Sequence, residues 1–218
     1  MNAKTTPSED MRTSTHLEYL ICSRYSERFF TGEPLPAGSV QRIVETALHA
    51  PSPSGRNPFY FVIAEERKAL EELAQELRSS FLELHVKSCG DASRNKVISY
   101  YERYSIFLEN AAALLLCYTN DRKSALDALF SDAKSEAANL ISLGTVLQNI
   151  GLLCTESNIG HCILSAPVEL FPELFDHIFR APPHLTLRCL VALGRAAGKG
   201  RKKPKAIPAQ RYVKVLQR

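Results

Sequence analysis

Apolar residues recur along the chain with two different periods, and these periods predict the order of helices and strands. Apolar positions that return every three or four residues predict helices over 15–23, 39–49, 65–87, 96–110 and 132–157. Short apolar runs predict strands over 59–65, 111–119 and 185–194, and a short extended segment followed by a short helix over 161–167. Because strands and helices do not alternate in a regular βαβ series, the sequence predicts a helix-rich α+β fold.

Ser39 is predicted to begin the second helix, which runs to His49. Its hydroxyl can accept a hydrogen bond from the first helical turn, as an N-cap residue does. The following stretch, "APSPSGRNP" (50–58), is so rich in Pro, Gly and Ser that it predicts a loop. This loop leads directly into the predicted strand 59–65 and offers backbone N–H groups and hydroxyls at its start.

The predicted helix 132–157 is apolar on most sides in its second half. Ala137, Gly144 and Gly151 follow one another at seven-residue intervals and form a stripe of small residues. Such a stripe lets another helix approach closely, either within the same chain or across a subunit interface. We favour the interface, because a small α+β unit buries an apolar central helix best by forming a homodimer.

Positive charge is concentrated at one end of the chain. The whole sequence carries a net charge of +4, but nine of its Lys and Arg residues and no acidic residue lie in 195–218, so residues 1–194 carry −5. A basic tail can bind nucleic acid by neutralising phosphates. No stacking platform or reading helix lies nearby, so we favour a solvated tail and expect no nucleic-acid partner.

Length and composition fit one globular domain in 218 residues of which 45% are apolar. We expect a polar, disordered leader over 1–14, a single domain over 15–194 and a basic extension over 195–218. No apolar run approaches the roughly 20 residues that span a bilayer, and no secretory signal is visible. The six scattered cysteines suit buried thiols in a reducing cytoplasm, so we expect a cytoplasmic protein without a membrane partner.

The stretch "SRYSERFF" (23–30) places Arg24, Ser26 and Arg28 at alternate positions. In an extended segment all three side chains would point to one side, where two guanidinium groups and a hydroxyl match the oxygens of a phosphate. The alternative is a solvated helix end in which Glu27 pairs locally. Spacing alone favours the helix end, because short Arg/Ser patterns often occur by chance.

No motif for metal binding or nucleophilic catalysis is present in the sequence. It contains no Gly-rich phosphate loop, no H-E-x-x-H motif and no Ser-His-Asp order. His161 beside Cys162 is too little for a metal site, and the other histidines lie far apart in the sequence. We therefore expect no metal.

The order and spacing of four segments resemble the nitroreductase family of FMN-dependent oxidoreductases. The stretch "RYSERFFTGEPLP" is similar to the R-x-S-x-R-x-[FY] opening of that family and to the acidic-Pro-hydrophobic-Pro stretch behind it. The stretch "HAPSPSGRNPFYFVIA" is similar to its A-P-S loop and following strand. Further on, "LQNIGLLCTESNIGHCIL" looks like its Q-N helix and G-L-G turn, and "LVALGRA" like its last core strand. The resemblance covers nearly everything from residue 15 onward.

The resemblance implies a central, mainly antiparallel sheet surrounded by helices, in a homodimer whose C-terminal tails are exchanged between subunits. The strand-like "RYVKV" of the tail would then pair with the edge of the partner's sheet. The implied activity passes hydride from NAD(P)H, through flavin N5, to a flat acceptor such as a nitroaromatic or a quinone in a ping-pong cycle. One alternative is an FMN enzyme of the same fold with another chemistry, such as dehalogenation or flavin fragmentation. Another is a non-catalytic flavin-binding dimer.

Carried over by position, the resemblance assigns cofactor contacts and no catalytic side chain, because the chemistry belongs to the flavin. Arg24, Ser26 and Arg28 would hold the FMN phosphate and ribityl chain, with Arg211 of the tail as a further phosphate ligand. The contacts to the rest of the flavin would come from the Pro-rich loop, the long helix and the segment that ends in a short helix. They are Pro51, Ser52, Ser54, Gly55, Asn57, Gln148, Ser165 and Ala166.

Tyr100, Tyr101 and Tyr104 are candidates for lining the acceptor pocket, although an amphipathic helix surface explains them equally well. Gly55 stands where the family usually has Asn, which removes a side chain that addresses the pyrimidine edge of the flavin; Ser54 or Asn57 could substitute for it. Asn158 replaces the first Gly of the G-L-G turn, a mild change because Asn tolerates the left-handed backbone.

Overall fold

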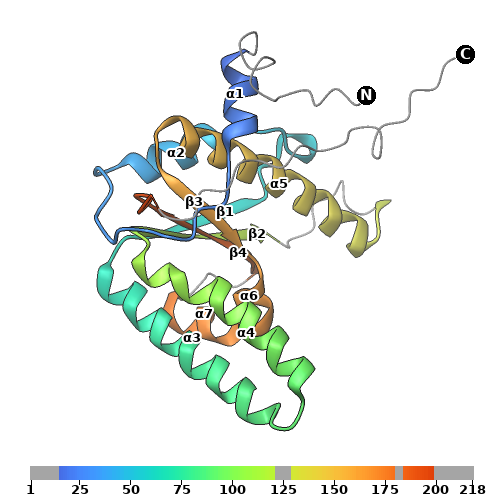
Figure 1. Cartoon of the computed structure of the whole chain (residues 1–218). Helices are drawn as coiled ribbons and strands as arrows, with labels where there is room; N and C mark the ends of the chain where they lie inside the picture. The colour runs from blue at the N-terminus through green and yellow to red at the C-terminus, as the bar shows by residue number, and fades with distance from the viewer. Residues whose placement is uncertain (1–14, 121–128, 180–183, 199–218) are drawn as a thin grey trace, which may run out of the picture.

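The computed structural model describes residues 15–120, 129–179 and 184–198, and its centre is a four-stranded sheet (Figure 1). The strands are β1 (Phe59–Ala64), β2 (Ala113–Asn120), β3 (Gly160–Leu164) and β4 (Leu185–Gly194). Their order across the sheet is β1-β2-β4-β3, and all three pairings are antiparallel. The prediction of a central, mainly antiparallel sheet is therefore confirmed.

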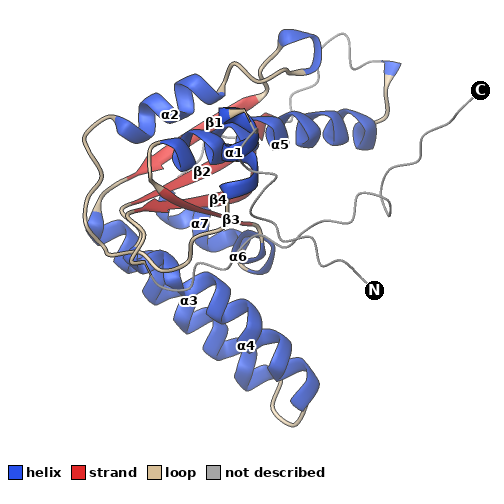
Figure 2. Cartoon of the chain, turned by 45° about the horizontal axis from the view of Figure 1, so that its top comes forward, coloured by secondary structure: helices blue, strands red, loops and turns tan. Residues whose placement is uncertain are grey.

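Helices cover both faces of this sheet (Figures 1 and 2). On one side lie α1 (His16–Ser23), α2 (Ser39–Ala47) and α5 (Asp132–Glu156). On the other lie α3 (Arg67–Lys87), α4 (Ala92–Ile106), α6 (Ala166–Leu170) and α7 (Pro172–Phe179). Two short 3-10 turns are η2 (Pro53–Gly55) and η3 (Phe107–Asn110). The predicted helices and strands are confirmed with small shifts at their ends, whereas α7 was not predicted.

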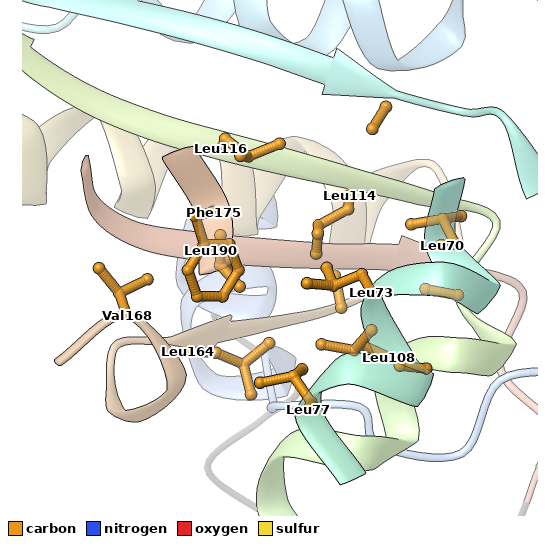
Figure 3. Packing of buried hydrophobic residues seen from close by; sticks show 14 of the residues in the cluster. Leu70, Leu73, Leu77, Leu108, Leu114, Leu116, Leu164, Val168, Phe175 and Leu190 are labelled. Carbon is orange, nitrogen blue, oxygen red and sulfur yellow. The ribbon is translucent and has the colours of Figure 1, made fainter. Parts of the chain in front are cut away.

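The side of the sheet under α3 and α7 holds the core shown in Figure 3. Leu114 and Leu116 of β2 point to this side because alternate strand residues share a face. They are buried with Leu190 of β4, Leu73 of α3 and Phe175 of α7. Full burial of each such side chain contributes about 1.5–3 kcal/mol, so this core fixes α3, and α4 with it, against the sheet.

The opposite side holds a second core against α2 and α5. Leu115 of β2 and Val191 of β4 point to this side and are buried with Val40 of α2 and Val146 of α5. Both faces of β2 are therefore covered. This explains why its sequence is a continuous apolar run rather than an alternation of apolar and polar residues.

The start of α2 differs by one residue from the predicted N-cap. Gly38 is the N-cap, with a left-handed backbone (φ 72°), and Ser39 is the first helical residue. The Ser39 hydroxyl is buried and has no hydrogen-bond partner among the described residues. The helix ends at Ala47 rather than His49, because the next residues form a turn. A positive φ costs glycine nothing, so the backbone requirement at Gly38 decided the cap.

The turn after α5 confirms the prediction for Asn158. Its backbone is left-handed (φ 54°), and the Ile159 N–H donates to the Cys154 carbonyl across the turn at 2.8 Å. This bond pattern ends many helices, usually with glycine at the left-handed position. The turn leads the chain straight into β3, so Asn158 determines where that strand begins.

The stripe of small residues on α5 meets two different environments. Gly151 faces inward, because a Cβ added there would lie 2.9 Å from His161 Nε2 and 3.1 Å from Arg24 Cδ. Gly144 has open space around it, and the adjacent Ile141 is 71% exposed. Internal packing therefore explains Gly151, while the outer part of the stripe is uncovered in the described part of the chain.

By length and composition, α5 is the one helix within the described residues that could cross a membrane. Its most apolar window has a mean hydropathy of 1.4, and 33% of that window is buried inside the structure. Core helices of soluble proteins pass the same test. The finding is therefore weak evidence for a membrane span.

Candidate cofactor site

The "RYSERFF" segment is extended. Arg24, the residue after α1, already has extended backbone angles (φ −60°, ψ 131°). The Glu27 N–H donates to the carbonyl of His161 in β3 at 2.8 Å, and Phe30 forms an antiparallel bridge with Ala196 after β4. The segment thus runs along the edge of the sheet, and the interpretation as a helix end is wrong.

Side chains at even positions of this segment approach β3 and α4. Ser26 and Arg28 lie close enough to Cys162 of β3 to influence its ionisation. Burial raises the pKa of the Cys162 thiol, while the Arg28 charge, the Ser26 hydroxyl and the Arg24 charge act against that rise. Arg24, Ser26 and Arg28 therefore converge on one stretch of β3, as the alternation predicted.

Two residues at odd positions of this segment line a pocket. Tyr25 and Thr31 line a pocket of about 390 Å³ together with Asn158, His161 and Arg195. Ser26 and Arg28 do not line this pocket, whereas Arg24 lies close to His161 in its lining.

Glu27 turns its carboxylate toward its own backbone. The side chain is 3% exposed, and Oε1 accepts hydrogen bonds from the N–H groups of Arg28 (2.9 Å) and Phe29 (2.8 Å). The Tyr25 hydroxyl donates to Oε2 at 2.8 Å. The local pairing of Glu27 was predicted only for a helix end, and here it fixes the shape of an extended segment.

Arg24 and Arg28 keep their positive charges unneutralised. Across residues 15–120, 129–179 and 184–198, neither guanidinium has a carboxylate oxygen within 4.0 Å. Both side chains are half-buried. Arg28 Nη1 donates to the Ser26 carbonyl at 3.3 Å, and its Cζ lies 4.9 Å from the centre of the Tyr104 ring. Half-buried guanidinium groups without an acidic partner suit an anion such as a phosphate.

His161 adds no charge to this region. It is 3% exposed, and its Nε2 has no hydrogen-bond partner among the described residues. Burial lowers the pKa of His161 to about 4, and the positive charge of Arg24 acts in the same direction. The imidazole is therefore neutral at neutral pH, and the positive field comes from the arginines.

The Pro-rich loop before β1 is held together largely by its own hydrogen bonds. The Ser52 carbonyl accepts from the Gly55 N–H at 3.1 Å, and the Ser52 hydroxyl accepts from the Asn57 N–H at 3.0 Å. The Thr145 hydroxyl of α5 donates to the Pro51 carbonyl at 3.4 Å. The N–H groups of Gly55 and Asn57 are thus used inside the loop.

Three residues of this loop have a left-handed backbone: Ser54 (φ 52°), Gly55 (φ 67°) and Asn57 (φ 46°), a conformation that costs glycine nothing. A Cβ added at Gly55 would meet no atom within 4 Å. Asn adopts this backbone more readily than most residues, so the usual family residue would fit here. Gly55 therefore removes a side chain without relieving any crowding in this chain.

The predicted contacts lie at different points along α5. The Pro-rich loop lies against Thr145, whereas Arg24 lies against Gly151. Gln148 is exposed on the same helix. The neighbouring Asn149 donates to the Ala47 carbonyl at 3.3 Å and so joins α5 to α2.

Ser165 and Ala166 directly follow β3, the strand that carries Cys162. Ser165 is the N-cap of α6 and is exposed, and Ala166 begins that helix. They come directly after the strand that Ser26 and Arg28 approach, where the chain turns into α6. The strand therefore links the predicted phosphate ligands to the predicted flavin-ring contacts.

The three tyrosines of α4 form a connected group. The ring centres of Tyr100 and Tyr101 are 5.5 Å apart, and those of Tyr100 and Tyr104 are 4.6 Å apart. The sequence did not predict the contact between the Tyr104 ring and the Arg28 guanidinium. The four-residue spacing of Tyr100 and Tyr104 shows that they share one helix face, but the approach of α4 to the arginine segment depends on tertiary packing.

The contact of Arg211 with a phosphate and the absence of a metal both stay predictions. Arg211, the rest of 199–218 and the leader 1–14 lie outside the described residues. Within the described part of the chain, no group of three or more His, Cys, Asp or Glu residues could hold a metal ion.

The fold agrees with what is found in known proteins. The model of the nitroreductase family matches residues 21–195, so the chain belongs to that family. It is similar to a BluB-like flavoprotein from Clostridium difficile 630, with 19% identity, a TM-score of 0.78 and coverage of 94% of this chain and 100% of that chain. It is also similar to a nitroreductase with bound FMN from Bacteroides fragilis NCTC 9343, with 18% identity, a TM-score of 0.69 and the same coverage.

A further similar structure is an FMN and NADPH-dependent nitroreductase derived from Sphigopyxis sp. strain HMH. It has 16% identity and a TM-score of 0.67, and the match covers 92% of this chain and 99% of that chain. At these identities the solved structures show a shared fold, and the family match confirms the resemblance stated from the sequence.

The buried His161 predicts a loss of stability in acid. A histidine in the unfolded chain has a pKa of about 6.5, whereas folding lowers that of His161 to about 4. The unfolded state therefore binds the proton first as the pH falls. The free energy of unfolding should drop between about pH 6.5 and pH 4, by roughly 3 kcal/mol in total from this residue.

Urea denaturation at a series of pH values measures this effect. His161→Gln lacks the titrating group, so its unfolding free energy should vary less with pH over that range, whatever its absolute stability. If the wild-type chain and His161→Gln lose stability in parallel between pH 6.5 and pH 4, the assignment of this pH dependence to His161 is wrong.

Proposed function

We propose that this protein is an FMN-dependent oxidoreductase that passes hydride from NAD(P)H to a flat acceptor such as a nitroaromatic or a quinone. The observation that carries the proposal is the half-buried pair Arg24 and Arg28, which has no carboxylate partner among the described residues. Membership of the nitroreductase family and the FMN named for two similar structures support it. With Ser26, these arginines would hold the FMN phosphate and ribityl chain, and Arg211 would add a further phosphate ligand.

Bound FMN would supply the redox chemistry, taking hydride from NAD(P)H and passing it to the acceptor at the same place in a ping-pong cycle. The chain would bind and orient the reacting groups. Ser165 and Ala166 would lie beside the flavin ring, because they directly follow β3, the strand that Ser26 and Arg28 approach. The Cys162 thiol would stay protonated there, because burial raises its pKa. No described side chain is required as a general acid or base.

We propose that a second copy of the chain completes the site. The Pro-rich loop with Pro51 and Ser52 lies near the middle of α5, away from Arg24 near its end. A dimer across the exposed face of α5 would bring the loop of one subunit, with Ser54, Gly55 and Asn57, toward the arginines of the other. Gln148 would lie within this interface.

The same proposal includes the parts of the chain that lie outside the described residues. The basic extension 195–218 starts within the described residues, where Ala196 bridges Phe30 of the same chain. From residue 199 onward it would wrap around the partner, and its "RYVKV" stretch would pair with an edge of the partner's sheet, of which β1 is one. The leader 1–14 would remain outside the domain 15–194. We further propose a cytoplasmic protein that has no membrane or nucleic-acid partner.

The first test is turnover by the purified protein. We expect visible flavin absorbance, either as isolated or after addition of FMN, that bleaches with NADPH or NADH and returns with menadione or a nitroaromatic. Reversible bleaching without loss of flavin separates this activity from flavin fragmentation, and a halogenated substrate tests dehalogenation. Flavin that binds but does not react would indicate the non-catalytic alternative. A colourless chain that cannot be reconstituted with FMN would overturn the proposal.

Replacing Arg28 by Ala should weaken FMN binding by roughly 2 kcal/mol or more, because a charged donor to the phosphate is lost. Isothermal titration of the apoprotein with FMN measures this difference. Arg42→Ala is the matched control, since Arg42 is exposed on α2 and its replacement removes the same charge at a distant place. Equal FMN affinity in Arg28→Ala and Arg42→Ala would refute the role of Arg28.

Replacing Ile141 by Arg should disrupt the dimer, because it places a charge on the exposed apolar face of α5. We expect sedimentation velocity to show a dimer for the wild-type chain and a monomer for Ile141→Arg, with FMN binding weakened together with assembly. Leu82→Arg, at an exposed position on α3, is the control and should stay dimeric. A monomeric wild-type protein that binds FMN fully would contradict the shared site.

A further inference from the structure

Arg28, one of the proposed phosphate ligands, has a guanidinium with few fixed contacts. An arginine side chain carries about 2 kcal/mol of rotamer entropy, which must be lost when the guanidinium is fixed on a ligand. The backbone of Arg28 is already fixed, because its N–H donates to the buried Glu27 carboxylate at 2.9 Å. The guanidinium itself has one hydrogen bond among the described residues, from Nη1 to the Ser26 carbonyl at 3.3 Å.

The second contact of this guanidinium is an aromatic face. Arg28 Cζ lies 4.9 Å from the centre of the Tyr104 ring, within the range of a cation–π interaction. A contact with an aromatic face does not use the guanidinium N–H groups as donors to a carboxylate, so they stay available for phosphate oxygens. A carboxylate partner would instead occupy those donors and neutralise the charge.

Tyr104 itself packs against a second aromatic ring on α4. The Tyr100 ring lies 4.6 Å away on the preceding turn of α4, and the Tyr104 side chain is half-buried. Tyr100 and Tyr101, by contrast, are 58% and 40% exposed. The two ends of the tyrosine group therefore differ, because one contacts the arginine and the other faces solvent.

We propose that Tyr104 is a positioning residue for Arg28, which places it with the cofactor anchor instead of the acceptor pocket. Its ring holds the guanidinium in place so that the N–H donors stay available to the FMN phosphate. This inference rests on the proposed function, since it assumes that FMN is the ligand. The acceptor pocket would then keep Tyr100 and Tyr101 only.

The test compares FMN affinity among variants of the full-length apoprotein by isothermal titration. Tyr104→Leu should weaken FMN binding about 3- to 10-fold, the loss expected for a half-buried cation–π contact. Tyr104→Phe keeps the ring and should bind FMN within about twofold of wild type. Tyr101→Leu is the matched control and should leave FMN affinity unchanged while raising the KM for the acceptor.

A double variant separates positioning from a general structural effect. In an Arg28→Ala background, Tyr104→Leu should have little further effect on FMN affinity, because the guanidinium that the ring supports is gone. An undiminished loss in that background, or unchanged FMN affinity in Tyr104→Leu, would overturn the inference. If Tyr104→Leu does not fold, as judged by thermal melting, Tyr104→Gln replaces it.

The same titrations distinguish failure of this inference from failure of the proposed function. A wild-type chain that binds FMN, together with a Tyr104→Leu variant that binds it equally well, overturns only the positioning role. A wild-type chain that binds no FMN overturns the proposed function, and the positioning role with it.

Discussion

The candidate site depends on the direction in which one buried carboxylate points. Glu27 lies between Arg24 and Arg28 in the sequence and could have neutralised either of them. Its oxygens are instead occupied by two backbone N–H groups and the Tyr25 hydroxyl. Because a buried carboxylate needs such donors, Glu27 is stable without an arginine partner. The two guanidinium groups keep their charge, and this makes the edge segment a candidate anion site.

Pairing with the sheet edge gives this segment its regular alternation. The bonds to β3 and to the residues after β4 hold it extended, so even and odd positions separate onto two sides. Ser26 and Arg28 approach Cys162 of β3, Arg28 also contacts Tyr104 of α4, and Tyr25 and Thr31 line the pocket that includes His161. The turn at Asn158 sets where β3 begins and so which carbonyl Glu27 can pair with.

Local chemistry made much of this fold predictable from the sequence. Apolar periodicity located β2 and α5, and the left-handed Asn158 followed from its place at a helix end. The errors came from tertiary constraints. The left-handed backbone required at Gly38 moved the helix cap away from Ser39. The contact of Tyr104 with Arg28 depends on how α4 packs, and the spacing of the two residues in the sequence carries no sign of it. The contacts to the flavin ring, the dimer and the tail stay predictions.

The central claim is that Arg24 and Arg28 recognise a phosphate. The most direct measurement compares the affinities of the apoprotein for FMN and for riboflavin, which has the same ring system and ribityl chain but no phosphate. Two charged hydrogen-bond donors should make FMN bind about 100-fold more tightly than riboflavin, or better. Equal affinity for the two flavins would show that the arginine pair does not hold the phosphate and would contradict this account.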